Sequence, residues 1–228
     1  MLSILQKLMG KGSRGGGLGG KVDPFEKLSQ LGPPSPFSTL ARETIAEICA
    51  HMEMVPFSKG AQVIRQGDEG DYHYLLTEGT AQVTRCASAA AKPVVLAELK
   101  PGASFGEEAL ISMAKRNATV TMTSDGQVLR LSKEHFNTLV KEPQLQWLFW
   151  PDAQALLAQG AKLIDVRPAE EFLRGSLPEA MSIPILDLRS RLKDLDKAAM
   201  HVCVCQNSRL SAAAAFLLKQ NGFQAAVL

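Results

Sequence analysis

The spacing of apolar and polar residues divides this chain of 228 residues into two parts. Between residues 55 and 131, short apolar runs alternate with glycine-containing turns, which is typical of an antiparallel β-barrel or sandwich. The expected strands cover residues 62–65, 72–76, 81–85, 94–99, 119–123 and 127–131. A helix with apolar residues at helical spacing, residues 40–52, precedes them, and another runs from about Ser132 to Pro143.

Beyond Trp150 the pattern alternates between strands and helices, which favours a parallel sheet. The expected strands are residues 162–166, 201–205 and 224–228, and the expected helices are residues 153–159, 169–174, 186–195 and 210–221. We therefore predict a multidomain protein in which a jelly-roll-like antiparallel β-barrel with flanking helices is followed by an α/β domain. The predicted domains span residues 37–146 and 150–228, after a flexible, glycine-rich tail over residues 1–36.

Composition narrows the class of protein. Hydrophobic residues make up 46% and charged residues 21%, which is ordinary for a globular protein, and the net charge of +2 gives no footprint for nucleic acid. No apolar run approaches the about 18 residues of a membrane span. The four cysteines, Cys49, Cys86, Cys203 and Cys205, form no disulfide framework. We expect a cytoplasmic protein with no nucleic-acid partner, no membrane partner and no metal site.

The segment from Phe105 to Val120 carries the clearest chemical signal. Gly106 precedes a short helical turn whose backbone N–H groups could approach an anion. Arg116 offers a fork of donors that suits phosphate oxygens, and Glu107 could accept a hydrogen bond from a ribose hydroxyl. The alternative interpretation is a surface arginine and an acid that only interacts with the helix dipole.

This segment, together with KGAQVIRQGDEGDYHYLLTEG, PGASFGEEAL and KRNATV, resembles the cyclic-nucleotide-binding domain family. The resemblance implies a nucleotide site formed by Gly106, Glu107, Ala109, Arg116, Asn117 and Ala118. Arg116 would grip the cyclic phosphate, with cAMP or cGMP as a regulatory ligand and no obligatory cofactor. The family often has Ala in cAMP binders and Thr in cGMP binders at the position of Asn117. The choice of purine is therefore open, with cAMP as the default.

A second motif lies in the C-terminal half, where Cys205 ends a strand directly before a helix. Loop amides and a helix N-terminus favour a thiolate and can hold an anionic substrate or a persulfide. With LIDVR, GSLPEA and the later CQNSRLS, this part resembles a rhodanese domain. The resemblance implies Cys205 as nucleophile, with Arg209 as a candidate catalytic residue. The alternative is that Cys205 is a small buried apolar residue.

Several positions depart from the rhodanese pattern. Ser176 and Glu179 replace expected residues of the first turn, and in the cysteine loop Ser208 stands where a glycine is usual and Arg209 falls one place early. The sequence also stops at Leu228, before the family's last helix, so the domain is either minimal or truncated. These departures predict a rhodanese-like domain of weak or altered activity.

Together these observations predict a cyclic-nucleotide sensor whose binding domain regulates the rhodanese-like domain. The alternative is an enzyme, a nucleotide-gated sulfurtransferase that forms a persulfide on Cys205. Expected partners are the nucleotide and either a sulfur donor or a protein at the second domain. A transcription factor ranks last, because a rhodanese motif follows the barrel where a DNA-reading helix-turn-helix would be needed. Trp147, Phe149 or Trp150 is expected at the domain interface, either simply packing there or capping the purine.

Overall fold

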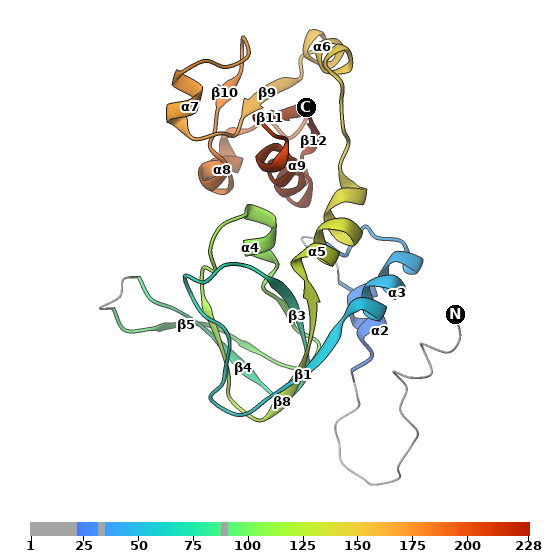
Figure 1. The fold of residues 1–228 in the computed structure, drawn as a ribbon, viewed down its shortest axis with the longest axis vertical. Coiled ribbons are helices and arrows are strands. Elements are labelled where there is room, and N and C mark those ends of the chain that lie inside the picture. Colours follow the sequence, from blue (N-terminus) through green and yellow to red (C-terminus); the bar gives the residue numbers. More distant parts are fainter. Residues whose placement is uncertain (1–21, 32–34, 88–90) are drawn as a thin grey trace.

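The computed structural model describes residues 22–31, 35–87 and 91–228, which fold into two lobes (Figure 1). The first lobe holds two four-stranded antiparallel sheets, with strand orders β1-β8-β3-β6 and β2-β7-β4-β5. Their strands are β1 (Glu53–Phe57), β2 (Gln62–Ile64), β3 (Tyr72–Glu78), β4 (Ala81–Arg85), β5 (Val94–Leu99), β6 (Ser104–Phe105), β7 (Thr119–Met122) and β8 (Gly126–Ser132). The predicted jelly-roll-like β-domain is confirmed.

Helices flank this β-domain at three points along the chain. They are α2 (Pro24–Ser29), α3 (Arg42–His51), α4 (Glu107–Ser112), α5 (Lys133–His135), the π-helix η1 (Phe136–Lys141) and the 3-10 helix η2 (Glu142–Gln144). The helix predicted from Ser132 to Pro143 is thus present, but its middle turn is π-helical. A π-helical turn is rare and is often found at functional sites.

The flexible tail predicted over residues 1–36 does not extend over residues 22–31. The Asp23 side chain accepts the backbone N–H groups of Phe25 and Glu26, which caps α2. Leu28 is fully buried in one apolar cluster with Ile45 and Ile48 of α3, and this burial fixes the helix to the domain. Residues 1–21 and 32–34, including the glycine-rich stretch, lie outside the described residues.

The second lobe is built on a parallel sheet, as predicted, and its strand order is β10-β9-β11-β12. Its elements are α6 (Trp150–Ala158), β9 (Lys162–Asp165), α7 (Ala169–Leu173), β10 (Met181–Ser182), α8 (Ile185–Arg191), η3 (Leu192–Asp194), β11 (Met200–Val204), α9 (Arg209–Gln220) and β12 (Gln224–Val227). Trp147 forms a parallel bridge with Val227. The connection between the lobes therefore adds to the β12 edge of this sheet.

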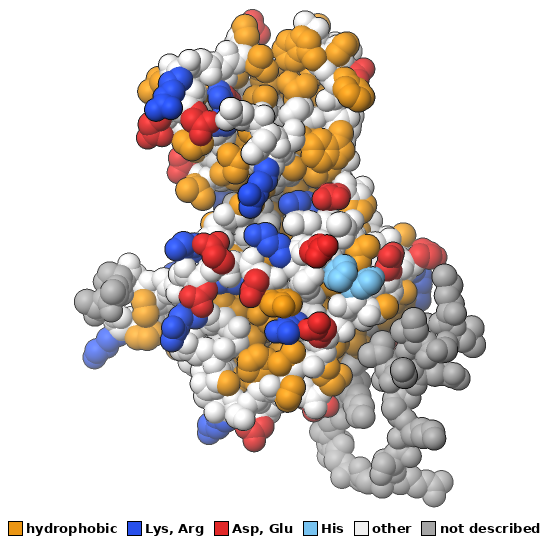
Figure 2. Space-filling model, in the orientation of Figure 1, with side chains coloured by type: hydrophobic (Ala, Val, Ile, Leu, Met, Phe, Trp, Pro, Cys, Tyr) orange, Lys and Arg blue, Asp and Glu red, His pale blue; other side chains and the backbone are white. Residues whose placement is uncertain are grey.

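The two lobes share one buried apolar cluster. Leu110 and Ile111 on α4 belong to the same cluster as Ala213 and Phe216 on α9, and Figure 1 shows α9 between the parallel sheet and α4. Basic and acidic side chains are intermixed at the narrow waist outside this cluster (Figure 2). No helix within the described ranges is long and apolar enough to span a membrane.

Candidate functional site

Gly106 connects β6 to the start of α4 and has a left-handed backbone, with φ of 88°. A Cβ atom there would lie 3.0 Å from Nη1 of Arg116 and 3.1 Å from Cδ1 of Ile64. Both the positive φ and the close approach require glycine. Ala109, one turn into α4, is buried and faces Gly70 so closely that a Cβ atom on Gly70 would lie 2.7 Å from its own.

Arg116 is buried, with 5% of its surface exposed, and is not a surface arginine. Its Nη1 donates to the backbone oxygen of Gly106 at 2.6 Å. Its Nη2 donates to the backbone oxygen of Tyr72 at 2.7 Å and to Oδ1 of Asp71 at 3.2 Å. A guanidinium group has five N–H donors in a rigid fork. Arg116 is therefore held at the start of α4 while it keeps donors for an anion.

Glu107 lies beside a buried histidine and keeps an unused acceptor. Its Oε2 atom is buried, lies 3.9 Å from Nδ1 of His73 and has no hydrogen-bond partner among the described residues. Burial, with a smaller effect of Arg116, lowers the pKa of His73 to about 3, so this ring is neutral at pH 7. Burial also raises the pKa of Glu107. A ligand hydroxyl is the kind of donor that this acceptor lacks.

The last two predicted nucleotide-site residues lie just after Arg116. Ala118 is buried, whereas Asn117 is exposed and its backbone oxygen accepts a hydrogen bond from Nε of Arg85 at 2.9 Å. The structure thus gathers Gly106, Glu107 and Arg116, with Ala109 behind them. Sequence reasoning missed the residues around them at the start of β3, which are Asp71, just before the strand, and Tyr72, His73 and Tyr74 within it. Their signal was the GDYHY run, in which Tyr74 pairs with Phe105 of β6.

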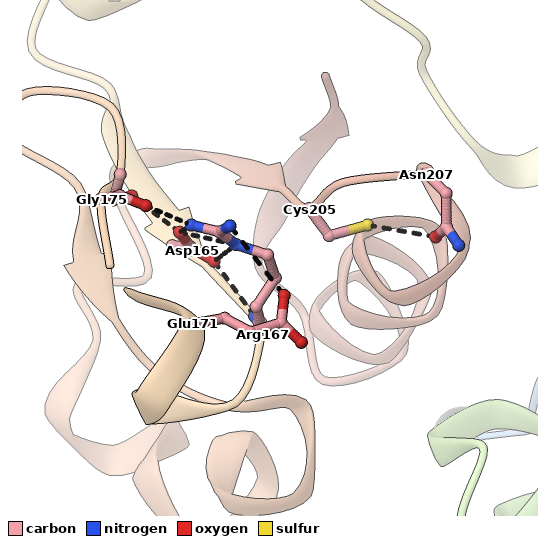
Figure 3. Close-up of polar contacts among 7 residues, drawn as sticks. Asp165, Arg167, Glu171, Gly175, Cys205 and Asn207 are labelled. Atoms are coloured by element: carbon pink, nitrogen blue, oxygen red, sulfur yellow. Dashed lines mark hydrogen bonds and ion pairs between the residues drawn. The ribbon is translucent and has the colours of Figure 1, made fainter. Parts of the chain in front are cut away.

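Cys205 follows β11 and lies at the start of α9, where the sequence placed it. Its Sγ atom accepts the backbone N–H of Ser211 at 3.3 Å, lies 3.3 Å from the Ser211 hydroxyl and lies 4.0 Å from Oδ1 of Asn207 (Figure 3). Ser208 in this loop has a φ of 59°. Ser208, which stands where the resemblance expects glycine, thus has a left-handed backbone that glycine adopts without strain. The thiol meets a helix N-terminus and hydrogen-bond donors, a setting that suits sulfur anions.

A hydrogen-bonded group of charged side chains stands beside this loop (Figure 3). Arg167 donates through Nε to Oδ1 of Asp165 at 3.0 Å and through Nη2 to the backbone oxygen of Gly175 at 2.8 Å, and Ser176 donates to Oδ2 of Asp165 at 2.7 Å. Burial acts to raise the pKa of Asp165, but the hydrogen bonds from Arg167 and Ser176 outweigh it and lower that pKa. The pKa of Arg167 is raised, mainly by its hydrogen bond to Asp165 and in smaller part by the electrostatic effect of Cys205. Arg167 is therefore a cation near the thiol.

Arg209, the other candidate catalytic residue, lines a pocket between the two lobes. No hydrogen bond or ion pair within the described part of the chain joins its side chain to Cys205. Trp147 lines the same pocket, whereas Phe149 is 81% exposed. Cys203 is fully buried, which raises the pKa of its thiol to about 12.

Comparison with known proteins finds a family match for each of the two domains. Residues 54–142 match the family model of the cyclic nucleotide-binding domain, and residues 150–228 match that of the rhodanese-like domain. The chain is 33% identical over 103 residues to cGMP-dependent protein kinase, isozyme 1, of Drosophila melanogaster, a match that covers 44% of this chain and 13% of the kinase. It is 37% identical over 90 residues to the cAMP-dependent protein kinase regulatory subunit of Dictyostelium discoideum, covering 39% of this chain and 28% of that subunit.

Among solved structures, the regulatory domain of Toxoplasma gondii PKA with cAMP is similar, with a TM-score of 0.47 and 24% identity over 59% of this chain and 47% of that chain. The chain thus matches only a small part of the two kinase proteins. The protein combines a cyclic nucleotide-binding domain, homologous to those of the cAMP- and cGMP-dependent kinases, with a rhodanese-like domain.

Proposed function

We propose that this chain is a cyclic-nucleotide sensor in which binding of cAMP regulates the attached rhodanese-like domain. The supporting observation is the contact between α4 and α9, because the start of α4 would form the nucleotide site and the cysteine loop lies at the start of α9. Leu110 and Ile111 of α4 are buried in the same cluster as Ala212 and Ala213 of α9. A displacement of α4 must therefore be followed by α9 or leave a cavity between them.

Binding of a cyclic phosphate would change the contacts at the start of α4 and could displace this helix. The phosphate would take hydrogen bonds from the start of α4 and from Arg116. Arg116 already donates to the backbone oxygen of Gly106, the N-cap residue of that helix. A new anion competing for this guanidinium would change how it holds Gly106, and the ligand's ribose would supply the donor that Oε2 of Glu107 lacks.

We propose cAMP ahead of cGMP as the default ligand, since Asn117 is neither the Ala that the resemblance associates with cAMP binders nor the Thr that it associates with cGMP binders. The matched kinase proteins include five named for cGMP and one named for cAMP, so their names do not support this choice. Asn117 is exposed, so replacing it tests the choice without disturbing the core. If Asn117→Thr raises the affinity for cGMP relative to cAMP, this position contributes to the selectivity between the two purines.

Calorimetric titration of cAMP and cGMP tests the binding site. Wild type should bind, and Arg116→Ala should not. Because Arg116 is buried and makes three hydrogen bonds, circular dichroism must show that the variant is folded. Glu107→Gln is a milder second variant that keeps the size of the side chain and should weaken binding about tenfold or more. Equal binding by all three proteins would show that the nucleotide site lies elsewhere.

An enzymatic role is the second candidate, supported by the thiol at the start of α9 and by Arg167 near it. The Cys205 thiolate would attack the outer sulfur of thiosulfate, so that sulfite leaves with the electron pair and a persulfide remains. Cyanide would then take that sulfur as thiocyanate and return the thiolate. A sulfur donor, or a protein that binds the loop, would be the partner of this domain.

Thiocyanate formation with and without cAMP separates the two roles. A rate that depends on Cys205, by comparison with Cys205→Ser, and that changes with cAMP supports the gated sulfurtransferase. Absence of any Cys205-dependent thiocyanate, in a protein that binds cAMP, supports the sensor with a docking domain. Under both roles, proteolysis or hydrogen exchange of residues 205–211 should change when cAMP binds. No change there would contradict the proposed regulation.

A further inference from the structure

A pocket of about 280 Å³ lies between the two domains, and of the candidate site residues described above only Arg209 lines it. The cyclic nucleotide-binding domain contributes α4, α5 and η1 to its wall, and the rhodanese-like domain contributes the start of α9. Arg116 and Cys205 are not among its lining residues. A ligand here would touch the outer side of the cysteine loop and the nucleotide-binding domain at once.

Three basic side chains converge on this pocket: Lys133, Lys141 and Arg209. Lys141 is 91% buried, since only 9% of its surface is exposed. Within the described residues, none of the three side chains takes part in a hydrogen bond or an ion pair. Glu142 is the one carboxylate that lines the pocket. The lining therefore carries an excess of two positive charges.

The basic groups also affect each other. Burial lowers the pKa of Lys141, Glu142 opposes this, and Lys133 and Arg209 lower it further. Burying a cation without a close anion costs several kcal/mol in general, so native proteins rarely do so without compensation. An anion from outside the chain would supply that compensation.

Asn137 gives a second, independent sign of a ligand. It lines the pocket, and its Oδ1 atom is buried with no hydrogen-bond partner in the described part of the chain. Asn137 and Lys141 are both carried by the π-helical turn η1. Buried amide oxygens are nearly always paired, so this atom calls for a donor such as a ligand hydroxyl.

The other residues that line the pocket indicate what else the ligand must contain besides an anionic group. Leu110, Leu145 and Trp147 form an apolar side. Ser208 and Arg209 also line the pocket, at the N-cap and first residue of α9, a helix of 12 residues whose N-terminus favours a negative charge. The ligand therefore needs an anionic head group and an apolar part, and the volume exceeds that of an inorganic ion.

We propose that this pocket binds a small phosphate monoester, with the phosphate between Lys133, Lys141 and Arg209 and an apolar body against Leu110 and Trp147. A monoester carries between one and two negative charges at pH 7 and keeps a hydroxyl in part of the population, which matches the excess charge and the Asn137 acceptor. The ligand bridges the two domains, so it would also hold the cysteine loop against η1.

Phenyl phosphate is a suitable probe, with full-length Trp150→Phe protein as the reference so that Trp147 is the only tryptophan. We expect a saturable change in Trp147 fluorescence that weakens as salt is raised. Lys141→Met should weaken binding about tenfold to hundredfold, and Lys133→Gln and Arg209→Gln about tenfold. Lys193→Gln, an exposed lysine on η3, changes the net charge equally and should bind like the reference.

Three further measurements make the result decisive. Lys141→Met should melt no lower than the reference in the absence of anions, because it removes an uncompensated buried charge; if it fails to fold, the two Gln variants carry the test. Phenol should not bind, and inorganic phosphate should bind more weakly than phenyl phosphate. No saturable binding, equal binding by all the pocket variants, or loss of binding in Arg116→Ala but not in Lys133→Gln would overturn the proposal.

Discussion

Oε1 of Glu108 on α4 lies 3.4 Å from Nε of Arg189 on α8, so an ion pair joins the helix of the proposed nucleotide site to the rhodanese-like domain. The two side chains are 42% and 49% exposed. Pairs with this exposure contribute roughly 0 to 1 kcal/mol, because water and salt screen them. The buried apolar contact between α4 and α9 must therefore carry most of the coupling between the domains.

Replacing Arg189 with Ala should accordingly lower the free energy of unfolding by less than about 1 kcal/mol, and the difference should vanish in high salt. Arg191→Ala is a matched control on the same helix, because Arg191 is equally exposed but forms its ion pair with nearby Asp194 of the same domain. Chemical denaturation at low and high salt measures both variants. A loss of several kcal/mol in Arg189→Ala alone would mean that the ion pair, and not the apolar contact, holds the interface.

The shared apolar cluster predicts cooperative unfolding of the whole chain. Because Ile111 of α4 and Phe216 of α9 are buried in one cluster, neither domain can unfold without exposing the other's core. We expect a single calorimetric transition, and Ile111→Ala should lower its midpoint without splitting it, at a cost of about 2 to 4 kcal/mol. Two resolved transitions in the wild-type protein would contradict this.

Gly106 provides a test of the nucleotide site with a close control. Gly106 and Gly60 have nearly the same positive φ, 88° and 87°, but a Cβ atom on Gly60 meets nothing within 4 Å. Gly60→Ala should cost about 1 kcal/mol from backbone strain alone. Gly106→Ala should cost more, since it also displaces Arg116, and it should weaken cAMP binding about tenfold or more. Similar nucleotide affinity in both variants would remove Gly106 from the site.

Much of the fold could be predicted because its strands alternate apolar and polar residues between glycine turns. Strands β4 and β5 have the predicted bounds. Strand β1 was missed because Pro56 interrupts its pattern, which is tolerated since β1 is an edge strand that pairs only with β8. Residues 22–31 were assigned to the tail because one buried side chain, Leu28, gives too weak a pattern in so short a helix.

The candidate site residues that the sequence suggested are those close together in the chain. Gly106, Glu107 and Arg116 all belong to the single segment from Phe105 to Val120. Asp71, in contrast, is 45 residues from Arg116 and comes close to it because β3 pairs with β6. The pocket between the domains has no local pattern either. Lys141 and Arg209 line the same pocket because α9 packs against the first domain, and no sequence pattern in either segment predicts that contact.

Ser208 predicts a gain in stability from a single substitution. Its left-handed backbone, with φ of 59°, strains a non-glycine residue, and its side chain makes no capping hydrogen bond at the start of α9. Ser208→Gly should raise the free energy of unfolding by about 0.5 to 1 kcal/mol. Glu179→Gly, at a φ of 63° away from the loop, should stabilise similarly. If thiol alkylation of Cys205 changes in Ser208→Gly alone, this strain also shapes the loop.

His73 makes stability depend on pH. It is fully buried, and burial and Arg116 lower its pKa to about 3 from an ordinary value of 6.5. Between these values the unfolded chain binds a proton that the folded protein does not, so stability must fall as the pH is lowered from about 6.5 toward 3, by up to about 1.4 kcal/mol per pH unit. The pKa of His201 is lowered too, with the same sign, whereas the raised pKa of Glu107 acts in the opposite direction.

Two variants isolate the contribution of His73 from those of the other groups. His73→Phe removes the titrating ring but preserves its size beside Phe37 and Phe136, so its unfolding free energy should depend less steeply on pH between 6.5 and 4. Ser104→Ala removes only the hydroxyl that lies 3.2 Å from Nε2 of His73, so it should lower stability and keep the wild-type slope. Urea denaturation across this range measures both slopes. Equal slopes in wild type and His73→Phe would mean that His73 takes up its proton in the folded protein.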